Sequence, residues 1–359
     1  MSVVGGGQPS ATKAQVAGVV TFYMVAALVM VFVNKLVLNA APQLPVLFLF
    51  NQMLIAVALL HISAALSPRV KLPSWDYATA KGLVPVVSVN AIGLVWNTLC
   101  LRAVDASYFQ IARGLVLPLT VLVAAAHGRK RPSLLVIAAV VLVTGGFLIG
   151  TSPSATLTAA ASQAGLIYGA LGAFAIAAHA VLIGAALPIV KGSALELAYW
   201  TNAGSAVLLL PLVVLNGEGT QVWTASQGIY QTWAGNTVQS GVANGGDINW
   251  SVFTIGSLVT GVFGFLLCVA TLISIKVTSP VTHMFTSAVR SVLQTFLGVW
   301  LFKDILTVNR LASILVILLG SCLYTWVKSY ENRRRAAQSA SAPVPTAENA
   351  ATKESTEKV

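Results

Sequence analysis

The stretch PVTHMFTSAVRSVLQTFLGVWLF, residues 280–302, has the length of a membrane-spanning helix and carries a charge near its middle, Arg290. The nearest flanking lysines lie fourteen residues before it and thirteen after it, about 20 Å away at the rise of a helix. A second apolar stretch, residues 106–127, carries Arg113. Because a charge inside a bilayer costs several kcal/mol, such arginines normally face a polar interior or a ligand. The two stretches therefore predict a membrane protein with a polar cavity.

The composition of the chain agrees with this prediction. Of its 359 residues 57% are hydrophobic and 9% are charged, whereas a soluble domain carries about 25% charged residues. The formal net charge is +11, but the basic residues fall mostly in short loops and tails, so we predict no nucleic-acid partner. Cys100, Cys268 and Cys322 are far apart in apolar segments, a pattern that predicts neither a disulfide nor a metal site. Nothing in the sequence predicts a cofactor.

Ten stretches have the length needed to cross a bilayer, near twenty residues each. They are residues 15–38, 44–66, 81–101, 106–127, 132–150, 164–186, 195–215, 251–275, 280–302 and 307–327.

The positive charges indicate how these spans are oriented. With a cytosolic amino terminus, thirteen lysines and arginines lie on the cytosolic side and four on the other, leaving out the distal tail and the two intramembrane arginines. Positive loops face the cytosol, so we predict a multi-pass protein with both termini cytosolic. The predicted organisation is a cytosolic segment 1–14, a first five-helix repeat 15–150, a linker 151–163, a second five-helix repeat 164–327 with a luminal loop 216–250, and a disordered cytosolic tail 328–359.

The two predicted repeats enter the membrane from opposite faces, because five spans are an odd number. Inverted repeats with a polar site at mid-depth are the architecture of many secondary transporters. The predicted fold class is an all-α membrane protein with ten transmembrane helices arranged as two inverted five-helix repeats. Arg113 lies in the fourth span and Arg290 in the ninth, the corresponding span of the second repeat.

Polar side chains accompany both arginines and are candidates for substrate binding. The helix of Arg290 carries a polar stripe at spacings of three to four residues, made of His283, Ser287, Ser291 and Gln294. Tyr108 and Gln110 lie close to Arg113, and Pro118 predicts a kink in the same span. Two structural alternatives remain open: Arg113 pairs with Asp105, or Arg290 bonds to backbone carbonyls of a neighbouring helix.

Further polar candidates lie elsewhere in the predicted spans. They are Asn90, Asn97, Tyr199 and Asn202, together with Asn34 and Lys35 at the outer end of the first span. A buried amide needs a hydrogen-bond partner, and a neighbouring helix supplies one as readily as a ligand does. For Asn34 and Lys35 the alternative is simple anchoring at the membrane interface.

The acidic residues of the membrane region fall in loops or at the ends of spans. This argues against a proton relay or a sodium site, and against a membrane-embedded transferase, which would need an acid/base pair or metal-binding acids. We therefore predict that the protein is not an enzyme. Two interior cations without a counter-charge predict an anionic substrate, and the planar fork of arginine matches phosphate. Exchange of one anion for another keeps the cavity neutralised, which favours antiport over uniport.

The sequence resembles the nucleotide-sugar transporters of the drug/metabolite transporter superfamily, most closely the GDP-fucose transporters. The stretches that carry the resemblance are MVFVNKLVL (30–38), NTLCLRAVDASYFQIARGL (97–115), GGFLIG (145–150), YWTNAGSA (199–206), TSPVTHMFTSAVRSVLQT (278–295) and GSCLYTWVKSYE (320–331). The resemblance implies the fold of that superfamily and a location in the Golgi membrane, in preference to the endoplasmic reticulum. It also implies import of GDP-fucose in exchange for GMP, with the arginines binding the diphosphate in a central cavity.

Individual residues match the motifs of the resembled family. Arg113 matches the arginine of the motif in its fourth span, and Arg290 stands where a lysine is usual in the ninth. Tyr199 and Asn202 fall where the family has an aromatic residue and an asparagine of a guanine-nucleotide motif. Thr201 replaces a second asparagine, and Ser287-Ala-Val-Arg290 replaces the Gly-x-x-Asn-Lys form of GDP-mannose transporters.

These departures weaken a GDP-mannose assignment and leave alternative substrates. They are another nucleotide sugar (GDP-mannose or a UDP-sugar) and the organophosphates of a triose-phosphate-type phosphate exchanger. The sequence leaves open whether the chain forms a homodimer.

Overall fold

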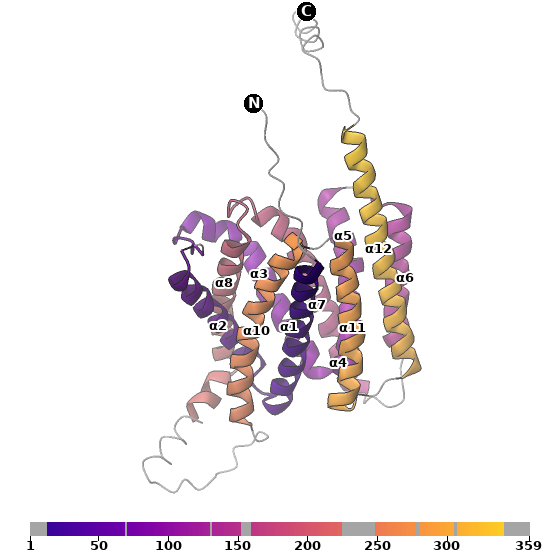
Figure 1. The fold of residues 1–359 in the computed structure, drawn as a ribbon. Coiled ribbons are helices and arrows are strands. Elements are labelled where there is room, and N and C mark those ends of the chain that lie inside the picture. Colours follow the sequence, from indigo (N-terminus) through magenta and orange to yellow (C-terminus); the bar gives the residue numbers. More distant parts are fainter. Residues whose placement is uncertain are drawn as a thin grey trace, which may run out of the picture.

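In the computed structural model of the protein, residues 13–68, 70–129, 131–151, 159–224, 248–277, 280–304 and 307–340 are described, and helix is the only regular secondary structure within these ranges. The helices are α1 (Lys13–Ala40), α2 (Pro45–Leu66), α3 (Tyr77–Ala103), α4 (Ala106–Gly114), α5 (Val116–Gly128), α6 (Leu134–Thr151), α7 (Ala159–Ala186), α8 (Ala194–Leu215), α10 (Trp250–Val277), α11 (Pro280–Phe302) and α12 (Val308–Ala340). They form one bundle of roughly aligned helices (Figure 1).

Nine helical stretches among the described residues are long and apolar enough to cross a membrane. The helix α11 adds a shorter apolar stretch, Val289–Phe302. The prediction of an all-α membrane protein is confirmed, and each of the ten predicted ranges coincides with helix, the fourth being divided between α4 and α5. The number of ten spans and the inverted repeat stay predictions.

Two predicted boundaries differ from the structure. Residues 328–340 were predicted as the start of a disordered tail, but α12 continues through them and rises beyond the other helices (Figure 1). The segment is rich in Lys, Glu, Arg, Ala and Gln, which all favour helix, and Lys328 pairs with Glu331 one turn later. The helix α7 begins at Ala159, inside the predicted linker 151–163, of which residues 152–158 lie outside the described residues.

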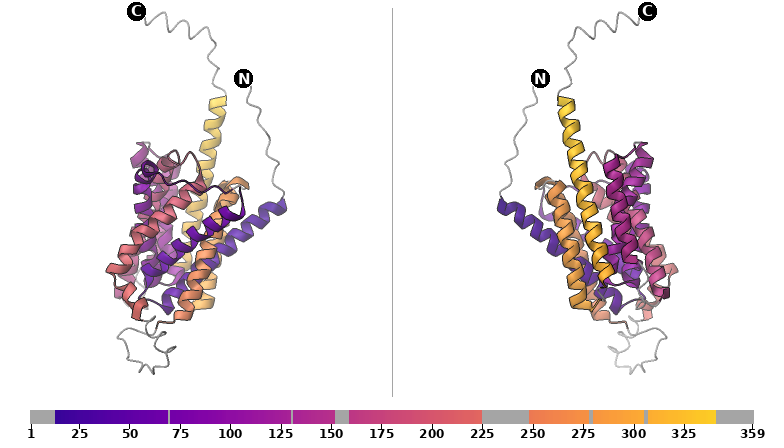
Figure 2. Two further views of the ribbon diagram at one scale, coloured as in Figure 1. Left: turned by 90° about the vertical axis from the view of Figure 1, so that its left-hand side faces the viewer. Right: turned by 90° about the vertical axis from the view of Figure 1, so that its right-hand side faces the viewer.

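Helices pack in pairs that join the two halves of the chain. The most extensive contacts are α6 with α12, α3 with α7, α1 with α10 and α2 with α8, followed by α2 with α10 and α3 with α8. Each of these pairs combines a helix of the first predicted repeat with one of the second. The first half of α1 inclines away from the rest of the bundle (Figure 2).

Small residues allow α6 and α12 to approach closely. A Cβ atom added to Gly146 of α6 would lie 3.1 Å from the carbonyl oxygen of Ser313 and 2.9 Å from the side chain of Ile317. One added to Gly320 of α12 would lie 3.2 Å from the carbonyl oxygen of Ala139. In a bilayer, helices associate through close packing of this kind rather than through hydrophobic burial. The closely packed pair of α6 and α12 contacts α4 with both of its helices.

The fourth predicted span is broken into α4 and α5 at Leu115. The break follows from Pro118, which has no N–H to bond the carbonyl of Gly114 and whose ring would collide with that carbonyl in a straight helix. The interruption lies three residues before the proline, in the span where the sequence predicts a kink. Its effect is to place Arg113 in the last turn of a short helix.

Glu218 closes one end of α2 from a distant part of the chain. Its side chain is 2% exposed and its carboxylate accepts hydrogen bonds from the backbone N–H groups of Val46 (3.2 Å) and Leu47 (2.6 Å). Leu44, at the N-cap position of α2, cannot supply such a cap itself. Burial raises the pKa of Glu218, against the opposing effect of the two N–H donors. Glu218 therefore acts as the missing cap of α2.

We expect Glu218→Ala to lower the free energy of unfolding by about 1–2 kcal/mol, because two N–H groups at the start of α2 lose their acceptor. Thermal unfolding of the purified protein in detergent measures this loss. Glu218→Gln keeps an acceptor oxygen and is the matched control, with a smaller expected loss. Equal stability of the alanine variant and the wild-type protein would contradict the capping role.

Candidate functional site

The two intramembrane arginines line the same cavity. This cavity has a volume of about 250 Å³ and lies among α4, α5, α11 and α12. Arg113, Arg290, Gln110 and Ser321 contribute polar groups to its wall, and α12 contributes apolar side chains such as Ile317. We call it the arginine cavity. The structure thus brings together two residues that are 177 positions apart in the sequence, 113 and 290.

A hydrogen bond between α4 and α11 fixes the two arginine-bearing helices against each other. The side-chain amide of Gln110 donates to the hydroxyl of Ser291 over 2.6 Å. Gln110 lies one turn before Arg113, and Ser291 directly follows Arg290. The bond therefore ties the two helices together next to their arginines, and both of its partners line the arginine cavity.

Neither guanidinium forms an ion pair with any carboxylate whose side chain the structure describes. The Cζ atom of Arg113 lies 5.8 Å from the ring centroid of Phe109, and that of Arg290 lies 5.9 Å from the ring centroid of Tyr23. These contacts stabilise a cation weakly. The Nε atom of Arg290 is buried and has no hydrogen-bond partner among the described residues. The cavity therefore keeps an excess of positive charge.

The break at Leu115 partly compensates the charge of Arg113. Because α4 ends at Gly114, its last carbonyl groups lie in the same turn as the arginine. The C-terminal end of a helix carries a partial negative charge, which stabilises a cation by a fraction of a kcal/mol to about 2 kcal/mol. No comparable break interrupts α11 around Arg290.

Asp105 does not neutralise Arg113, contrary to one alternative reading of the sequence. It forms an ion pair with Arg310 of α12, with 3.1 Å between Nη1 and Oδ2. Lys35 is attracted electrostatically to both Asp105 and Asp304. The acids at this end of the bundle are therefore engaged by Lys35 and Arg310, away from the arginine cavity.

Lys35 lies at the end of α3 rather than with the arginines. Its ammonium group donates to the carbonyl oxygens of Leu101 (2.8 Å) and Val104 (2.7 Å), and over 3.5 Å to that of Arg102. A lysine is stabilised in this position, where the last carbonyls of a helix lack partners. This contact gives Lys35 a structural role, and its predicted role in substrate binding has no support from its position.

A second cavity, of about 220 Å³, lies among α3, α4 and α7. Its wall contains Asn90 and Asn97 of α3, His179 of α7 and again Arg113. Arg113 therefore borders both cavities. We call the second one the amide cavity, after its two asparagines. Of the predicted candidates, Asn97 is thereby brought next to Arg113.

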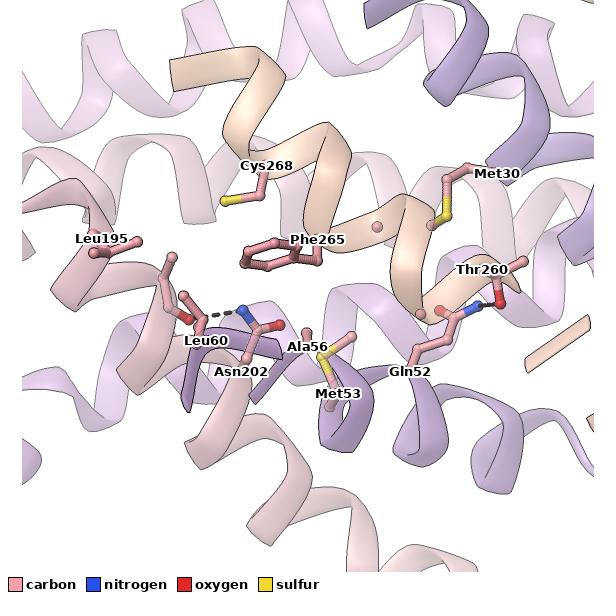
Figure 3. Close-up of a pocket in the computed structure, with 13 residues that line it drawn as sticks. Met30, Gln52, Met53, Ala56, Leu60, Leu195, Asn202, Thr260, Phe265 and Cys268 are labelled. Atoms are coloured by element: carbon pink, nitrogen blue, oxygen red, sulfur yellow. Dashed lines mark hydrogen bonds between the residues drawn. The ribbon is translucent and has the colours of Figure 1, made fainter. Parts of the chain in front are cut away.

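A third cavity, of about 140 Å³, lies among α1, α2, α8 and α10 and is mainly apolar. Figure 3 shows the ring of Phe265 facing the carboxamide of Asn202, with Gln52 and Thr260 bonded to each other nearby. The Asn202 amide donates to the carbonyl of Ala198, one turn earlier in α8. Neither arginine lines this cavity, so Asn202 is separated from the other polar candidates.

The remaining candidates are dispersed. Tyr108 is buried under the guanidinium of Arg310, 5.4 Å from ring centroid to Cζ. Gln294 is 1% exposed and donates weakly to the carbonyl of Ala106 over 3.4 Å, which ties α11 to the start of α4. Tyr199 packs against the ring of His61 and lines none of the three cavities. The side chains of His283 and Ser287 lie outside the described residues.

One residue that lines a cavity, His179, and one that contacts Arg290, Tyr23, were overlooked in the sequence. His179 is an ionisable residue inside the sixth predicted span, and that position alone is a signal for function. Tyr23 is a buried aromatic of α1 that stacks with Arg290. Nothing in its sequence environment distinguishes it from the other aromatic residues of the spans.

Comparison with known proteins gives the family of the chain. The model of the Triose-phosphate Transporter family matches residues 14–325. GDP-fucose transporter 1 of Dictyostelium discoideum is 26% identical over 326 residues, covering 89% of this chain and 82% of that protein. GDP-fucose transporter 1 of Mus musculus is 29% identical over 341 residues, covering 92% and 88%.

A third relative bears a location in its name. The protein named GDP-fucose transporter, Golgi, of Drosophila melanogaster is 25% identical over 336 residues, covering 90% of this chain and 93% of that protein. The resemblance seen in the sequence is thus confirmed. Because the family model covers most of the chain, the protein is a membrane transporter, not an enzyme, and belongs to the Triose-phosphate Transporter family.

Proposed function

We propose that the protein is a Golgi antiporter that imports GDP-fucose in exchange for GMP. The observation that carries the proposal is the arginine cavity, where Arg113 and Arg290 meet without a described carboxylate to neutralise them. A dianionic group, such as the diphosphate of a nucleotide sugar or the phosphate of a nucleoside monophosphate, would supply the missing charge, and arginine binds phosphate through two parallel hydrogen bonds. Relatives named GDP-fucose transporters support the choice of substrate, and one of them carries Golgi in its name.

In this proposal the nucleotide base enters the third cavity, whose apolar walls suit a flat heterocycle. The amide nitrogens of Asn202 and Gln52 are engaged by protein acceptors, which leaves their carbonyl oxygens to accept from N–H groups of guanine. The helix α1 connects the two sites: Tyr23 stacks on Arg290, and Met30, seven residues later, lines the third cavity. Seven residues of helix span about 10 Å, so the phosphate site and the base site lie about that far apart along α1.

Exchange requires a scaffold that opens alternately to either side, and two inverted repeats are such a scaffold. The proposal is supported by the way the helices pair. An inverted repeat would make α1 correspond to α7, α2 to α8 and α3 to α10. Under that correspondence the contact of α1 with α10 in one direction becomes the contact of α7 with α3 in the other, and both are present. In the same way the contact of α2 with α10 becomes that of α8 with α3, and both of these are present too. The excess of basic residues on one side of the predicted spans supports cytosolic termini.

The name of the family favours a second candidate, an exchanger of small organophosphates for phosphate. Counterflow into liposomes that contain the purified protein separates the two. We expect preloaded GMP to stimulate uptake of labelled GDP-fucose, while UMP, CMP and phosphate do not. Stimulation by UMP but not by GMP would overturn the guanine assignment, and uptake of triose phosphates driven by phosphate would establish the second candidate.

A further inference from the structure

The amide cavity contains polar groups that the arginine cavity does not explain. Asn90 and Asn97 lie on α3 two turns apart, and His179 lies on the facing helix α7. Two glycines let these helices pack closely, because side chains of the facing helix occupy the space that a Cβ atom would need. A Cβ added to Gly93 would lie 3.0 Å from the Cβ of Ala175, and one added to Gly172 would lie 3.2 Å from the side-chain nitrogen of Asn97. The polar groups are therefore held at fixed positions.

The hydrogen bonds of the amide cavity leave specific atoms unused. The amide nitrogen of Asn90 donates to the hydroxyl of Ser205 (3.1 Å), and that of Asn97 donates to the carbonyl of Gly93 (2.8 Å). Both carboxamide oxygens keep acceptor capacity. The Nε2 atom of His179 is buried and has no hydrogen-bond partner among the described residues. A buried polar atom of this kind is expected to have a partner in the functional state.

These atoms suit a sugar better than a heterocyclic base. Each sugar hydroxyl both donates and accepts, so a single sugar can satisfy the two amide oxygens and the histidine nitrogen. A base would need a flat apolar face, but the aromatic residue of this cavity, Phe109, is already covered by Arg113. Ile176 and Leu94 give the same wall an apolar part, which fits the methyl group of a 6-deoxy sugar.

Arg113 gives the amide cavity its connection to the phosphate site. The side chain borders both cavities, so a diphosphate on Arg113 and Arg290 lies next to the amide cavity. The sugar of a nucleotide sugar is attached directly to the second phosphate of the diphosphate. A group bound in the amide cavity is therefore within reach of the bond that joins sugar and phosphate.

We propose that the amide cavity is the sugar-binding site and that His179 is a specificity-determining residue, bonding a hydroxyl of the bound 6-deoxyhexose. The inference rests on the proposed function, because it assumes a nucleotide sugar as substrate. It adds to that function the place where the sugar is recognised and the residue that recognises it. GMP has no sugar beyond its ribose and leaves the amide cavity untouched.

The test compares two exchange reactions of the same reconstituted protein. In liposomes preloaded with GMP, uptake of labelled GDP-fucose depends on the sugar site, whereas uptake of labelled GMP does not. We expect His179→Phe to lower GDP-fucose uptake about tenfold, the effect of losing one hydrogen bond to a buried group, and to leave GMP/GMP exchange unchanged. His179→Asn retains a donor and an acceptor and should restore part of the uptake.

Each result has one meaning. An equal loss of both exchange reactions in His179→Phe, or no loss in either, overturns the sugar site. His127→Phe, on the exposed end of α5, is the matched control and should change neither reaction. A wild-type protein that exchanges GMP for GMP but takes up no GDP-sugar contradicts the proposed function first, and the inference falls with it. That failure is visible in the wild-type protein before any variant is compared.

Discussion

Replacing Arg290 with alanine is expected to abolish GDP-fucose uptake, with a loss on the order of a hundredfold or more. The variant removes two charge-assisted hydrogen bonds to the diphosphate, each contributing about 1.5–3 kcal/mol. It also removes half of the positive charge of the arginine cavity. Folding should be retained, because no described carboxylate depends on Arg290 for its partner. Counterflow of GDP-fucose against GMP measures the effect.

Three further variants make the result specific. Arg290→Lys keeps the charge but not the planar fork, so partial uptake is expected. Arg113→Ala should resemble Arg290→Ala, because both residues line the arginine cavity. Arg102→Ala removes an exposed arginine outside that cavity and should transport normally. Normal uptake by Arg290→Ala would exclude the arginine cavity as the diphosphate site.

Asp105→Ala is expected to cause a large loss of stability, roughly 3 kcal/mol, near the lower end of the range for breaking a buried ion pair. Arg310 is 4% exposed and keeps its charge in the variant, while Asp105 itself is 37% exposed, which moderates the loss. The contact joins the start of α4 to α12. Thermal or denaturant unfolding in detergent measures the change.

The ion pair between Lys328 and Glu331 supplies the matched control. Both of its side chains are partly exposed and lie one turn apart on α12, so Glu331→Gln should cost less than about 1 kcal/mol. The double variant Asp105→Ala with Arg310→Met tests the cause directly. It removes the buried charge together with its partner and should regain much of the stability lost in the single variant. A double variant as unstable as the single one would argue against this explanation.

The features that could be predicted from the sequence are those that depend on one helix at a time. Length and hydropathy gave the helices, and the cost of a charge in lipid singled out Arg113 and Arg290, which do share a cavity. The break in the fourth span was foreseen from Pro118, because its effect reaches only one turn along the chain.

The features that could not be predicted are contacts between helices that are far apart in the sequence. Asp105 is eight residues from Arg113, yet its partner is Arg310, 205 positions away. The carbonyls that bind Lys35 belong to α3, which no pattern near Lys35 reveals. His179 could have been found as an ionisable residue within a span, but its neighbours Asn90 and Asn97 become evident only from the packing of α3 against α7.

The division between α4 and α5 has a mechanical consequence. A continuous helix resists bending because every turn is tied to the next by backbone hydrogen bonds, and at Leu115 that ladder is interrupted by Pro118. The N–H of Leu115 still bonds the carbonyl of Ala112 (3.3 Å) and that of Leu119 still bonds the carbonyl of Leu115 (3.1 Å), so a bend at this joint has one backbone hydrogen bond fewer to break than a bend in a continuous helix. The short helix α4, bound to α11 through Gln110 and to α12 through Asp105, can therefore rotate with them while α5 stays against α7. Arg113 lies two residues before this joint, so a bend at Leu115 would move its guanidinium relative to α5.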